Sequence, residues 1–283
     1  MPRVKIVTDS ACDIDPKILE EKGIGVVPLT VHFGPESYKD GYEMRGRAFY
    51  DKLRTSEYHP RTSQPSPGDF QKVFEELTAD GSPVVAILLS SALSGTYQAA
   101  TIAAQALEGR QIAVVDSKAA SIGYGLIALE AQAMAEKGAS FEEVRDAALK
   151  MASTHATIFS VDTLDYLLKN GRIGRAQHFV GSLLNMKPIL TLDRDGYVAA
   201  VERVRGSSKV IPRMVELVGE RVPFGSRVLV GICHADALDR AQALKEMVVP
   251  KYDVARYEET EIGSIIGTHT GPGTLAVIVI PVP

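Results

Sequence analysis

The strongest constraint on the fold is a short apolar run followed directly by hydroxyl residues and a glycine. Residues 84–89 read Val-Val-Ala-Ile-Leu-Leu, and Ser90-Ser-Ala-Leu-Ser-Gly95 follows. Six apolar residues are too few to span a membrane and are typical of a strand that is buried on both faces of a parallel sheet. From Tyr97 onward, apolar and small residues recur at helical spacing. The pattern therefore predicts a strand, a tight polar turn and a helix.

The predicted turn is a candidate binding site for an anion. The N-terminus of a helix presents backbone N–H groups without helical partners and the positive end of the helix dipole. Ser94 and Gly95 lie at this point, where the Ser94 hydroxyl can donate a hydrogen bond to a ligand. The alternative is that Ser94 only caps the helix, as serine does in many proteins.

Strands and helices alternate through the first half of the chain, which predicts a mostly parallel sheet covered by helices on both faces. Ligands of open α/β sheets bind beyond the carboxyl ends of the strands. Three of the expected strands end in hydroxyl or carboxylate residues, so we expect a site at that edge. These ends are Thr8-Asp9-Ser10, Ser90-Ser91 and Asp116-Ser117.

The pattern changes after Ala152, where short strands and helices no longer alternate regularly. We therefore expect two domains: an α/β domain over residues 1–152 and an α+β domain with a mixed sheet over residues 153–283. Further expectations are one strand over Ile24–Val31, a polar Gly-rich segment over Glu261–Thr270, a helix through Phe179 and Leu183, and strands at Thr157–Val161, Pro188–Leu192, Tyr197–Val204, Val228–Cys233 and Leu275–Ile280.

Composition excludes several classes of protein. The net charge is −4 and no basic stripe occurs, which argues against a nucleic-acid surface. Cys12 and Cys233 lie far apart in sequence, as expected for unpaired thiols in a reducing compartment and not for a disulfide or zinc site. With no signal peptide and no run of 18 apolar residues, we expect a cytoplasmic protein without a membrane span. The absence of Trp indicates a mostly aliphatic core.

Common signatures of nucleotide and metal sites are missing. The sequence has no Gly-x4-Gly-Lys-Ser/Thr loop, no His-Glu-x-x-His and no Cys-x-x-Cys, so we expect no metal and no cofactor. Gly123-Tyr-Gly125-Leu-Ile-Ala128 imitates a dinucleotide fingerprint, but that motif must begin where its strand ends, and here Val115 lies well upstream. Close helix packing explains these glycines better.

A serine hydrolase acting on acyl esters is the alternative function. Ala119-Ala-Ser121-Ile-Gly123 is similar to a nucleophile elbow in which Ala replaces the first Gly. The segment is displaced from its strand, however. A catalytic triad would also need a histidine, and none of the six has a diagnostic context: His32, His59, His155, His178, His234 and His269.

Two further segments carry chemistry that fits a site. Gly171-Arg172-Ile-Gly174-Arg175 places two guanidinium groups on a glycine-flanked loop; they can bind a phosphate or a carboxylate of a partner, or simply face solvent. His269 stands among glycines before the last apolar strand. It is well placed to reach a site between two domains, although a single histidine is more often structural.

Together these segments resemble the DegV family of bacterial fatty-acid-binding proteins, in family order and over nearly the whole chain. The matching pieces are Val7-Thr-Asp-Ser10, Thr62-Ser-Gln-Pro-Ser-Pro67, Leu89-Ser-Ser-Ala-Leu-Ser-Gly-Thr-Tyr-Gln98, Asp116-Ser117, Gly171-Arg-Ile-Gly174 and Ile262-Gly-x3-Gly-Thr-His-Thr-Gly-Pro-Gly273.

The resemblance implies a two-domain α/β fold with one long-chain fatty acid, such as palmitate or oleate, in a tunnel between or adjoining the domains. It also implies a non-catalytic carrier role. A separate fatty acid kinase phosphorylates the presented carboxylate with ATP, and the acyl phosphate feeds phospholipid synthesis. Lipid exchange would bring transient contact with a membrane, although the sequence shows no amphipathic anchor.

The resemblance also assigns roles to individual residues, and this sequence shows no departure at those positions. Thr62 and Ser94 would hold the carboxylate, with Gly95 at the same helix N-terminus. His269 would support their hydrogen bonds, and Arg172 would contact the kinase.

Overall fold

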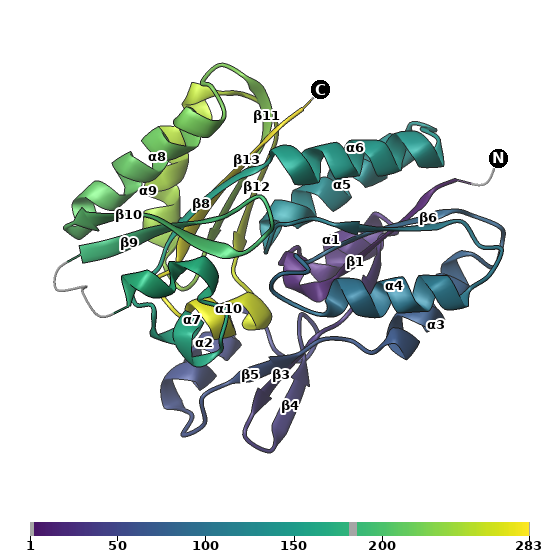
Figure 1. Ribbon diagram of the computed structural model, residues 1–283, viewed down its shortest axis with the longest axis horizontal. Helices are drawn as coiled ribbons and strands as arrows, with labels where there is room; N and C mark the ends of the chain where they lie inside the picture. The colour runs from purple at the N-terminus through teal and green to yellow at the C-terminus, as the bar shows by residue number, and fades with distance from the viewer. Residues whose placement is uncertain (1–2, 181–185, 283) are drawn as a thin grey trace.

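Two sheets lie side by side and share one buried helix, as Figure 1 shows. The computed structural model describes residues 3–180 and 186–282. The first sheet is parallel, in the order β2 (Gly25–Val27), β1 (Lys5–Asp9), β6 (Val84–Leu88) and β7 (Ile112–Asp116). The second has six strands, in the order β10 (Val198–Arg205), β9 (Met186–Leu192), β8 (Ala156–Ser160), β13 (Leu275–Pro281), β11 (Arg227–His234) and β12 (Asp253–Glu261).

Strand β6 is buried on both faces, as its sequence predicts. Val84, Ala86 and Leu88 pack in one cluster with the helices α3 (Pro67–Leu77) and α4 (Thr96–Ala106). Val85 and Ile87 face the opposite side, where α5 (Ile122–Glu136) and α6 (Phe141–Thr154) pack. Helix α1 (Pro16–Glu21) begins after Asp15, whose side chain accepts a hydrogen bond from the Lys17 N–H. The predicted α/β architecture is therefore confirmed.

The hydroxyl-ended strands meet at one edge because β1, β6 and β7 are neighbours. Hydrogen bonds tie the strand ends together. The Leu89 N–H donates to Asp9 Oδ2 over 2.9 Å, and the Ser91 N–H donates to Asp116 Oδ1 over 3.0 Å. The carboxylates at these ends thus shape the turn that leads into α4.

The second sheet is mixed, as predicted. The pair β11–β12 is parallel and the other neighbouring pairs are antiparallel. The helices α8 (Val210–Arg221) and α9 (Leu238–Val248) cover one face of this sheet. Residues 3–180 and 186–282 also contain four short 3-10 helices: η1 (Ser10–Cys12), η2 (Gly174–Phe179), η3 (Ser207–Lys209) and η4 (Val249–Lys251).

Helix α5 lies between the two sheets and contacts β1 and β6 of the first and β11 and β12 of the second. Most of its residues are buried around its whole circumference, as expected for a helix at the centre of a protein. The parallel sheet precedes residue 152 and the mixed sheet follows it, but α5 packs on both sheets. The division of the chain into two domains at residue 152 therefore stays a prediction.

A third, antiparallel sheet corrects the sequence prediction. Its order is β4 (Glu36–Lys39), β3 (Thr30–Phe33) and β5 (Arg61–Ser63). The single strand expected over residues 24–31 is in fact β2 and β3, which belong to different sheets. They are separated at Pro28, which has no N–H to donate to a continuous ladder.

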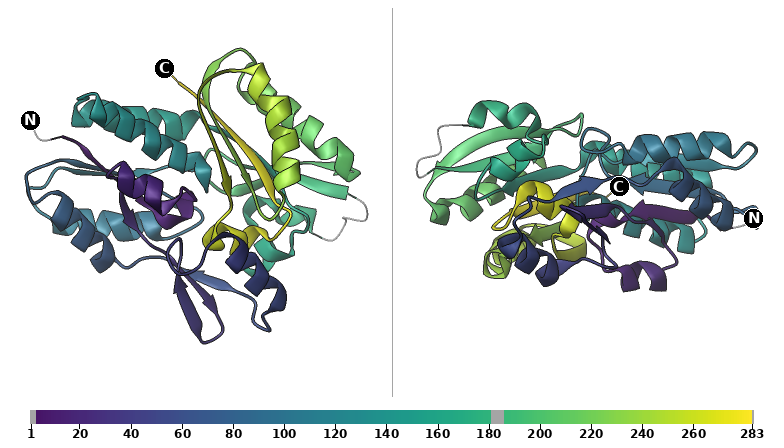
Figure 2. Two further views of the ribbon diagram at one scale, coloured as in Figure 1. Left: turned by 180° about the vertical axis from the view of Figure 1, so that it is seen from behind. Right: turned by 90° about the horizontal axis from the view of Figure 1, so that it is seen from below.

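The polar Gly-rich segment expected over residues 261–270 contains a helix that the sequence analysis did not predict. Residues Ser264–Thr270 form the helix α10. Figure 2 shows α10 beside the three-stranded sheet and helix α2 (Gly46–Thr55), and its other neighbour is α7 (Asp165–Lys169). The helix expected through Phe179 is η2, while Leu183 lies outside the described residues.

No helix among residues 3–180 and 186–282 has the length and apolar character required to cross a membrane.

The close packing of α5 gives a test of stability. A Cβ added to Gly125 would lie 2.9 Å from Ile14 Cδ1 and 3.0 Å from the Cys12 carbonyl oxygen. We expect Gly125→Ala to lower the free energy of unfolding by about 1–3 kcal/mol through overpacking, measured by urea denaturation. Gly68→Ala is the matched control: Gly68 is helical and its nearest neighbour would be 3.7 Å away, so it should gain roughly 0.5–1 kcal/mol. Equal effects at both positions would contradict this account.

Candidate functional site

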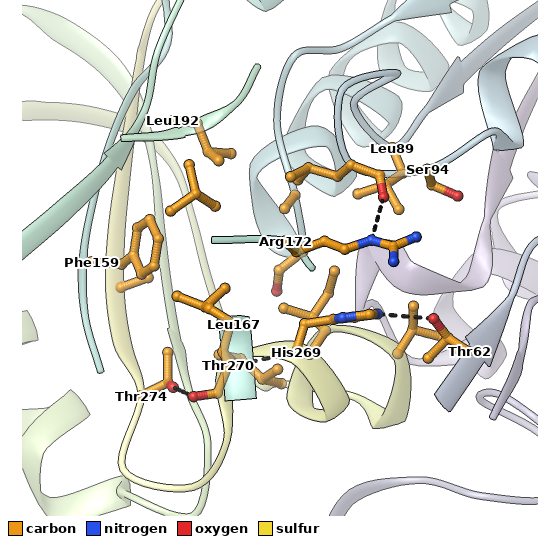
Figure 3. A pocket seen from close by; sticks show the side chains of 18 of the residues that line it. Thr62, Leu89, Ser94, Phe159, Leu167, Arg172, Leu192, His269, Thr270 and Thr274 are labelled. Carbon is orange, nitrogen blue, oxygen red and sulfur yellow. Dashed lines mark hydrogen bonds between the residues drawn. The ribbon is translucent and has the colours of Figure 1, made fainter. Parts of the chain in front are cut away.

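A cavity of about 290 Å³ lies at the junction of the three sheets, next to α10. Figure 3 shows Phe159 and Leu192 on one side of it and Thr62 and Ser94 on the other. Half of the residues that line it are aliphatic: Leu29, Leu89, Leu93, Ala120, Leu167, Leu192, Val198, Ile262, Ile265, Ile266, Ala276 and Ile278. The hydroxyl groups of Thr62 and Ser94 mark its polar end.

Ser94 is positioned by the turn between β6 and α4. Its Oγ lies 2.8 Å from Thr96 Oγ1 and accepts a hydrogen bond from the Thr96 N–H over 3.3 Å. Ser94 is therefore not the N-cap of α4, which is Gly95; it bonds to Thr96, the first residue of the helix, and also lines the cavity. The Ser94 N–H donates to the backbone carbonyl of Ser90 over 3.1 Å, and this hydrogen bond stabilises the turn.

Thr62 is the middle residue of β5, where it pairs with Val31 of β3, and it lines the cavity. Thr62 Oγ1 lies 2.8 Å from His269 Nε2, which belongs to α10. The two residues are 207 positions apart in sequence, so this contact joins the antiparallel sheet to the C-terminal part of the chain.

His269 is neutral at physiological pH. Burial, followed by the neighbouring Arg172 and His59, lowers the pKa of His269 to about 3. An imidazole with such a pKa does not add a positive charge to the cavity. It acts through hydrogen bonds alone.

The environment of His269 also fixes which nitrogen carries the hydrogen. Nδ1 is buried and has no hydrogen-bond partner among the described residues. An unpaired buried N–H costs more than an unpaired lone pair, so the hydrogen belongs on Nε2. Nε2 then donates to Thr62 Oγ1, and the Thr62 hydroxyl hydrogen is available to a group in the cavity.

Arg172 supplies the positive charge at this end of the cavity. Its Nε donates to the Leu93 carbonyl over 3.2 Å and its Nη1 donates to the Asn170 carbonyl over 2.8 Å. It lines the cavity and is solvent-exposed, which places it at the mouth, near Ser94 (Figure 3). Within the described residues, no carboxylate forms an ion pair with Arg172.

Gly95 is predicted to contact the ligand, and that role stays a prediction. A Cβ at Gly95 would lie 2.2 Å from Gln64 Oε1, so the Gln64 amide lies directly over the glycine. Gln64 itself lines the cavity. A larger residue at position 95 would have to displace the end of the Gln64 side chain.

The remaining hydroxyl groups of the wall all have hydrogen-bond partners within the protein: Ser63, Ser121, Thr157, Thr270 and Thr274. Thr270 donates to the Ile266 carbonyl over 3.1 Å and Thr274 donates to the Gly271 carbonyl over 2.8 Å. Ser121 Oγ lies 2.5 Å from Asp13 Oδ2. The wall beyond the Thr62 end is therefore effectively apolar.

The hydrogen-bond partners do not assemble a serine hydrolase triad at the two candidate serines. Ser94 pairs with Thr96, Ser121 pairs with Asp13, and His269 pairs with Thr62. Among the residues that the structure describes, no histidine bonds to Ser94 or Ser121. Nor do these residues contain a group of three or more His, Cys, Asp or Glu side chains able to hold a metal ion.

Comparisons with known proteins agree over the full length. The family model described as "Uncharacterised protein, DegV family COG1307" matches residues 3–282. The chain belongs to the DegV family. A DegV domain-containing protein of Caldanaerobacter subterraneus is 37% identical over 278 residues, which cover 98% of each chain.

Two solved DegV structures are similar in fold and are described by their ligand. A DegV family protein from Thermus thermophilus, described for its fatty acid binding, is 35% identical with a TM-score of 0.93, over 99% of this chain and 100% of that one. DegV of Bacillus subtilis, described as a fatty acid binding protein, is 31% identical with a TM-score of 0.88 over 100% of both chains.

The structure brings together Thr62, Ser94, His269 and Arg172, all of which the sequence singles out. Two contributors were not among the predicted site residues: Gln64, which covers Gly95, and the Leu93 carbonyl, which orients Arg172. Gln64 lies within the Thr62–Pro67 segment that resembles other DegV proteins, so that segment carried the signal. Every residue has a backbone carbonyl, so the sequence cannot indicate that the carbonyl of Leu93 has this role.

The neutrality of His269 is directly measurable. We expect two-dimensional ¹⁵N NMR of the imidazole to show the Nε2–H tautomer and no titration between pH 5 and 8, because the pKa of about 3 lies below that range. The unfolded state takes up this proton near pH 6.5, so His269 lowers the stability of the fold as pH falls below that value. A titration near pH 6.5 in the folded protein, or an Nδ1–H tautomer, would contradict the assignment.

Proposed function

We propose that this DegV protein binds one long-chain fatty acid, such as palmitate or oleate, and presents its carboxylate to a separate fatty acid kinase. The observation that carries the proposal is the aliphatic cavity whose polar end holds Thr62, Ser94 and a neutral His269. The fatty acid binding described for the Thermus and Bacillus relatives supports the same ligand class. The ligand would occupy a tunnel at the junction of the two proposed domains, residues 1–152 and 153–283.

The hydrocarbon chain supplies most of the binding free energy. Burying a methylene group gains about 0.8 kcal/mol, so a chain of about fifteen contributes on the order of 12 kcal/mol before entropic losses. Leucine is the commonest residue of the wall, and Thr270 and Thr274 direct their hydroxyl hydrogens to backbone carbonyls.

The carboxylate is oriented by neutral donors and one exposed cation. Thr62 can donate its hydroxyl hydrogen because His269 Nε2–H satisfies its lone pair. Ser94 and the Gly95 N–H stand at the N-terminus of α4, which favours negative charge. Arg172 adds a guanidinium group at the mouth, where solvent weakens its attraction.

Phosphoryl transfer from a partner requires an accessible carboxylate oxygen, and a carboxylate bound near the exposed Arg172 would leave one accessible. The oxygen attacks the γ-phosphorus of ATP and ADP leaves, giving an acyl phosphate for phospholipid synthesis. Because Arg172 is exposed beside the polar end, a kinase can contact this residue and reach the headgroup while the hydrocarbon chain stays buried. Cys12 and Cys233 are free thiols, which supports our further proposal that this exchange takes place in the cytoplasm.

The first test is lipid extraction from the purified protein followed by mass spectrometry. We expect one equivalent of a long-chain fatty acid, or uptake of added palmitate or oleate by delipidated protein. No fatty acid from the purified protein and no uptake of either lipid would reject the proposal. Transient association with lipid vesicles during uptake is expected, since the ligand enters from a membrane.

Two variants at the polar end of the cavity test which hydroxyl groups bind the fatty acid, by the same uptake of added palmitate or oleate. Ser94→Ala and Thr62→Val each remove one hydroxyl donor while preserving the apolar wall. Each should weaken fatty acid binding about 3- to 10-fold, which corresponds to one hydrogen bond of about 1 kcal/mol. If each variant binds a long-chain alcohol as tightly as the wild-type protein binds the same alcohol, the hydrogen bond lost in the variant is one to the carboxylate.

Arg172 provides the test of the kinase step. Arg172→Ala should retain most of the fatty acid but reduce acyl-phosphate formation at least about 10-fold, since a guanidinium–carboxylate contact with a partner is worth about 1.5–3 kcal/mol. Arg175→Ala is the matched control on the same loop, because Arg175 is already paired with Asp193 and Asp195. Loss of fatty acid from the Arg172 variant would instead make Arg172 a ligand of the carboxylate.

A further inference from the structure

Asn170 lies at the end of α7 and connects this helix to the glycine-flanked loop that carries Arg172. Its side-chain Nδ2 lies 2.9 Å from His59 Nε2, 3.0 Å from the Thr268 carbonyl oxygen and 3.3 Å from the Tyr166 carbonyl oxygen. His59 and Thr268 are 111 and 98 positions away in sequence. One side chain therefore joins three segments that are distant along the chain.

The end of α7 does not require this amide. The backbone N–H groups of Asn170, Gly171 and Arg172 already donate to carbonyl oxygens of α7. A helix end whose carbonyls are satisfied in this way gains little from a further side-chain donor. The contacts of the amide with His59 and Thr268 therefore serve the junction between the segments.

The Asn170 amide must donate to both of its distant partners. A carbonyl oxygen only accepts, so the atom that faces the Thr268 carbonyl is the amide nitrogen, which has two hydrogens and accepts none. His59 Nε2 must then be an acceptor, which places the hydrogen of the neutral ring on Nδ1. Partial burial, followed by the positive charges of Lys169 and Arg61, lowers the pKa of His59, which agrees with a neutral ring.

Each contact of Asn170 holds a segment that carries a residue of the polar end. His59 begins the segment His59-Pro-Arg-Thr62, which leads into β5. The residue of α10 that accepts from the amide directly precedes His269. The Asn170 carbonyl accepts from Arg172 Nη1 over 2.8 Å. Because Thr62, His269 and Arg172 all line the cavity, the contacts of one residue reach the segments of all three.

We propose that Asn170 is a positioning residue of the polar end, which keeps Thr62, His269 and Arg172 in one arrangement. The inference rests on the proposed function, in which these three residues serve the carboxylate and the kinase. The amide of Asn170 holds the segments of Thr62 and His269, and its backbone carbonyl holds the guanidinium group of Arg172. A carboxylate in the cavity and a kinase at the mouth would thus meet groups whose positions depend on one another.

The hydrogen bond to His59 is tested by ¹⁵N NMR of the imidazole in delipidated protein at pH 8, with His59→Gln identifying its signals. We expect the Nδ1–H tautomer in wild type. Asn170→Asp should move the hydrogen to Nε2, because a carboxylate can only accept. An Nε2–H tautomer in wild type, or an Nδ1–H tautomer that persists in Asn170→Asp, overturns the proposal. The wild-type spectrum needs no lipid and no variant of Asn170, so it decides this point whether or not the proposed function is correct.

Acyl-phosphate formation with the kinase then tests the positioning role. Asn170→Asp removes both donors without changing the size of the side chain, and should reduce acyl-phosphate formation at least about 10-fold. Fatty acid affinity should fall less, since the hydrocarbon chain supplies most of it. Gln132→Glu is the matched control: the Gln132 amide donates to the Lys22 carbonyl over 2.7 Å and does not line the cavity, so acyl-phosphate formation should stay within about twofold of wild type. Equal losses in the two variants would overturn the role of Asn170.

Two substitutions of His59 separate the hydrogen bond from the loss of the ring. Glutamine places a carbonyl oxygen near the position of Nε2 and can accept from Asn170, whereas leucine cannot. We expect His59→Gln to support acyl-phosphate formation within about twofold of wild type and His59→Leu to reduce it about 3- to 10-fold. Equal activity of these two variants would contradict the proposal. Wild-type protein that takes up no fatty acid would reject the proposed function and the positioning role with it, while the tautomer of His59 still reports the contacts of Asn170.

Discussion

The hydrogen bond between His269 and Thr62 is the contact on which the site depends. It joins α10 to the antiparallel sheet over 2.8 Å and a separation of 207 residues. Because burial keeps His269 neutral, the bond can fix the hydroxyl of Thr62 without adding charge. A protonated imidazole there would bind a carboxylate more strongly, but folding would then bury a cation whose Nδ1–H has no acceptor among the described residues.

Helix α10 has little intrinsic reason to form. It is seven residues long, and its Gly267, Thr268 and Thr270 are weak helix formers. Its stability comes from tertiary contacts: Asp40 accepts from its first residue, and Gly267 packs against Phe49 and Tyr50 of α2. A catalytic or binding side chain on such a helix is only as well placed as the buried groups that hold its first turn.

The sequence predicted those parts of the fold whose cause is local. A buried strand followed by Ser94 and Gly95 predicted the β6–α4 turn. The strands that end in hydroxyl residues predicted the edge of the parallel sheet at which this turn lies. Helix α10 was missed because it depends on partners distant in sequence, whereas the separation of β2 from β3 was missed although Pro28 marks it locally. Thr62, Ser94, His269 and Arg172 were picked out through resemblance and local chemistry, whereas Asp40 carries no sequence pattern that indicates its contact with Ser264 of α10.

The placement of charge suits the phosphoryl acceptor of the proposed function. A carboxylate held in a buried bidentate ion pair would be strongly desolvated and would lose nucleophilic character to its partner. Among the described residues, the cation that lines the cavity, Arg172, is exposed and held by the carbonyls of Leu93 and Asn170, while the remaining donors are neutral. In the proposed complex, the hydrocarbon chain supplies the affinity and the hydroxyls supply the orientation. Such a division would let the headgroup bind in a defined position and still react.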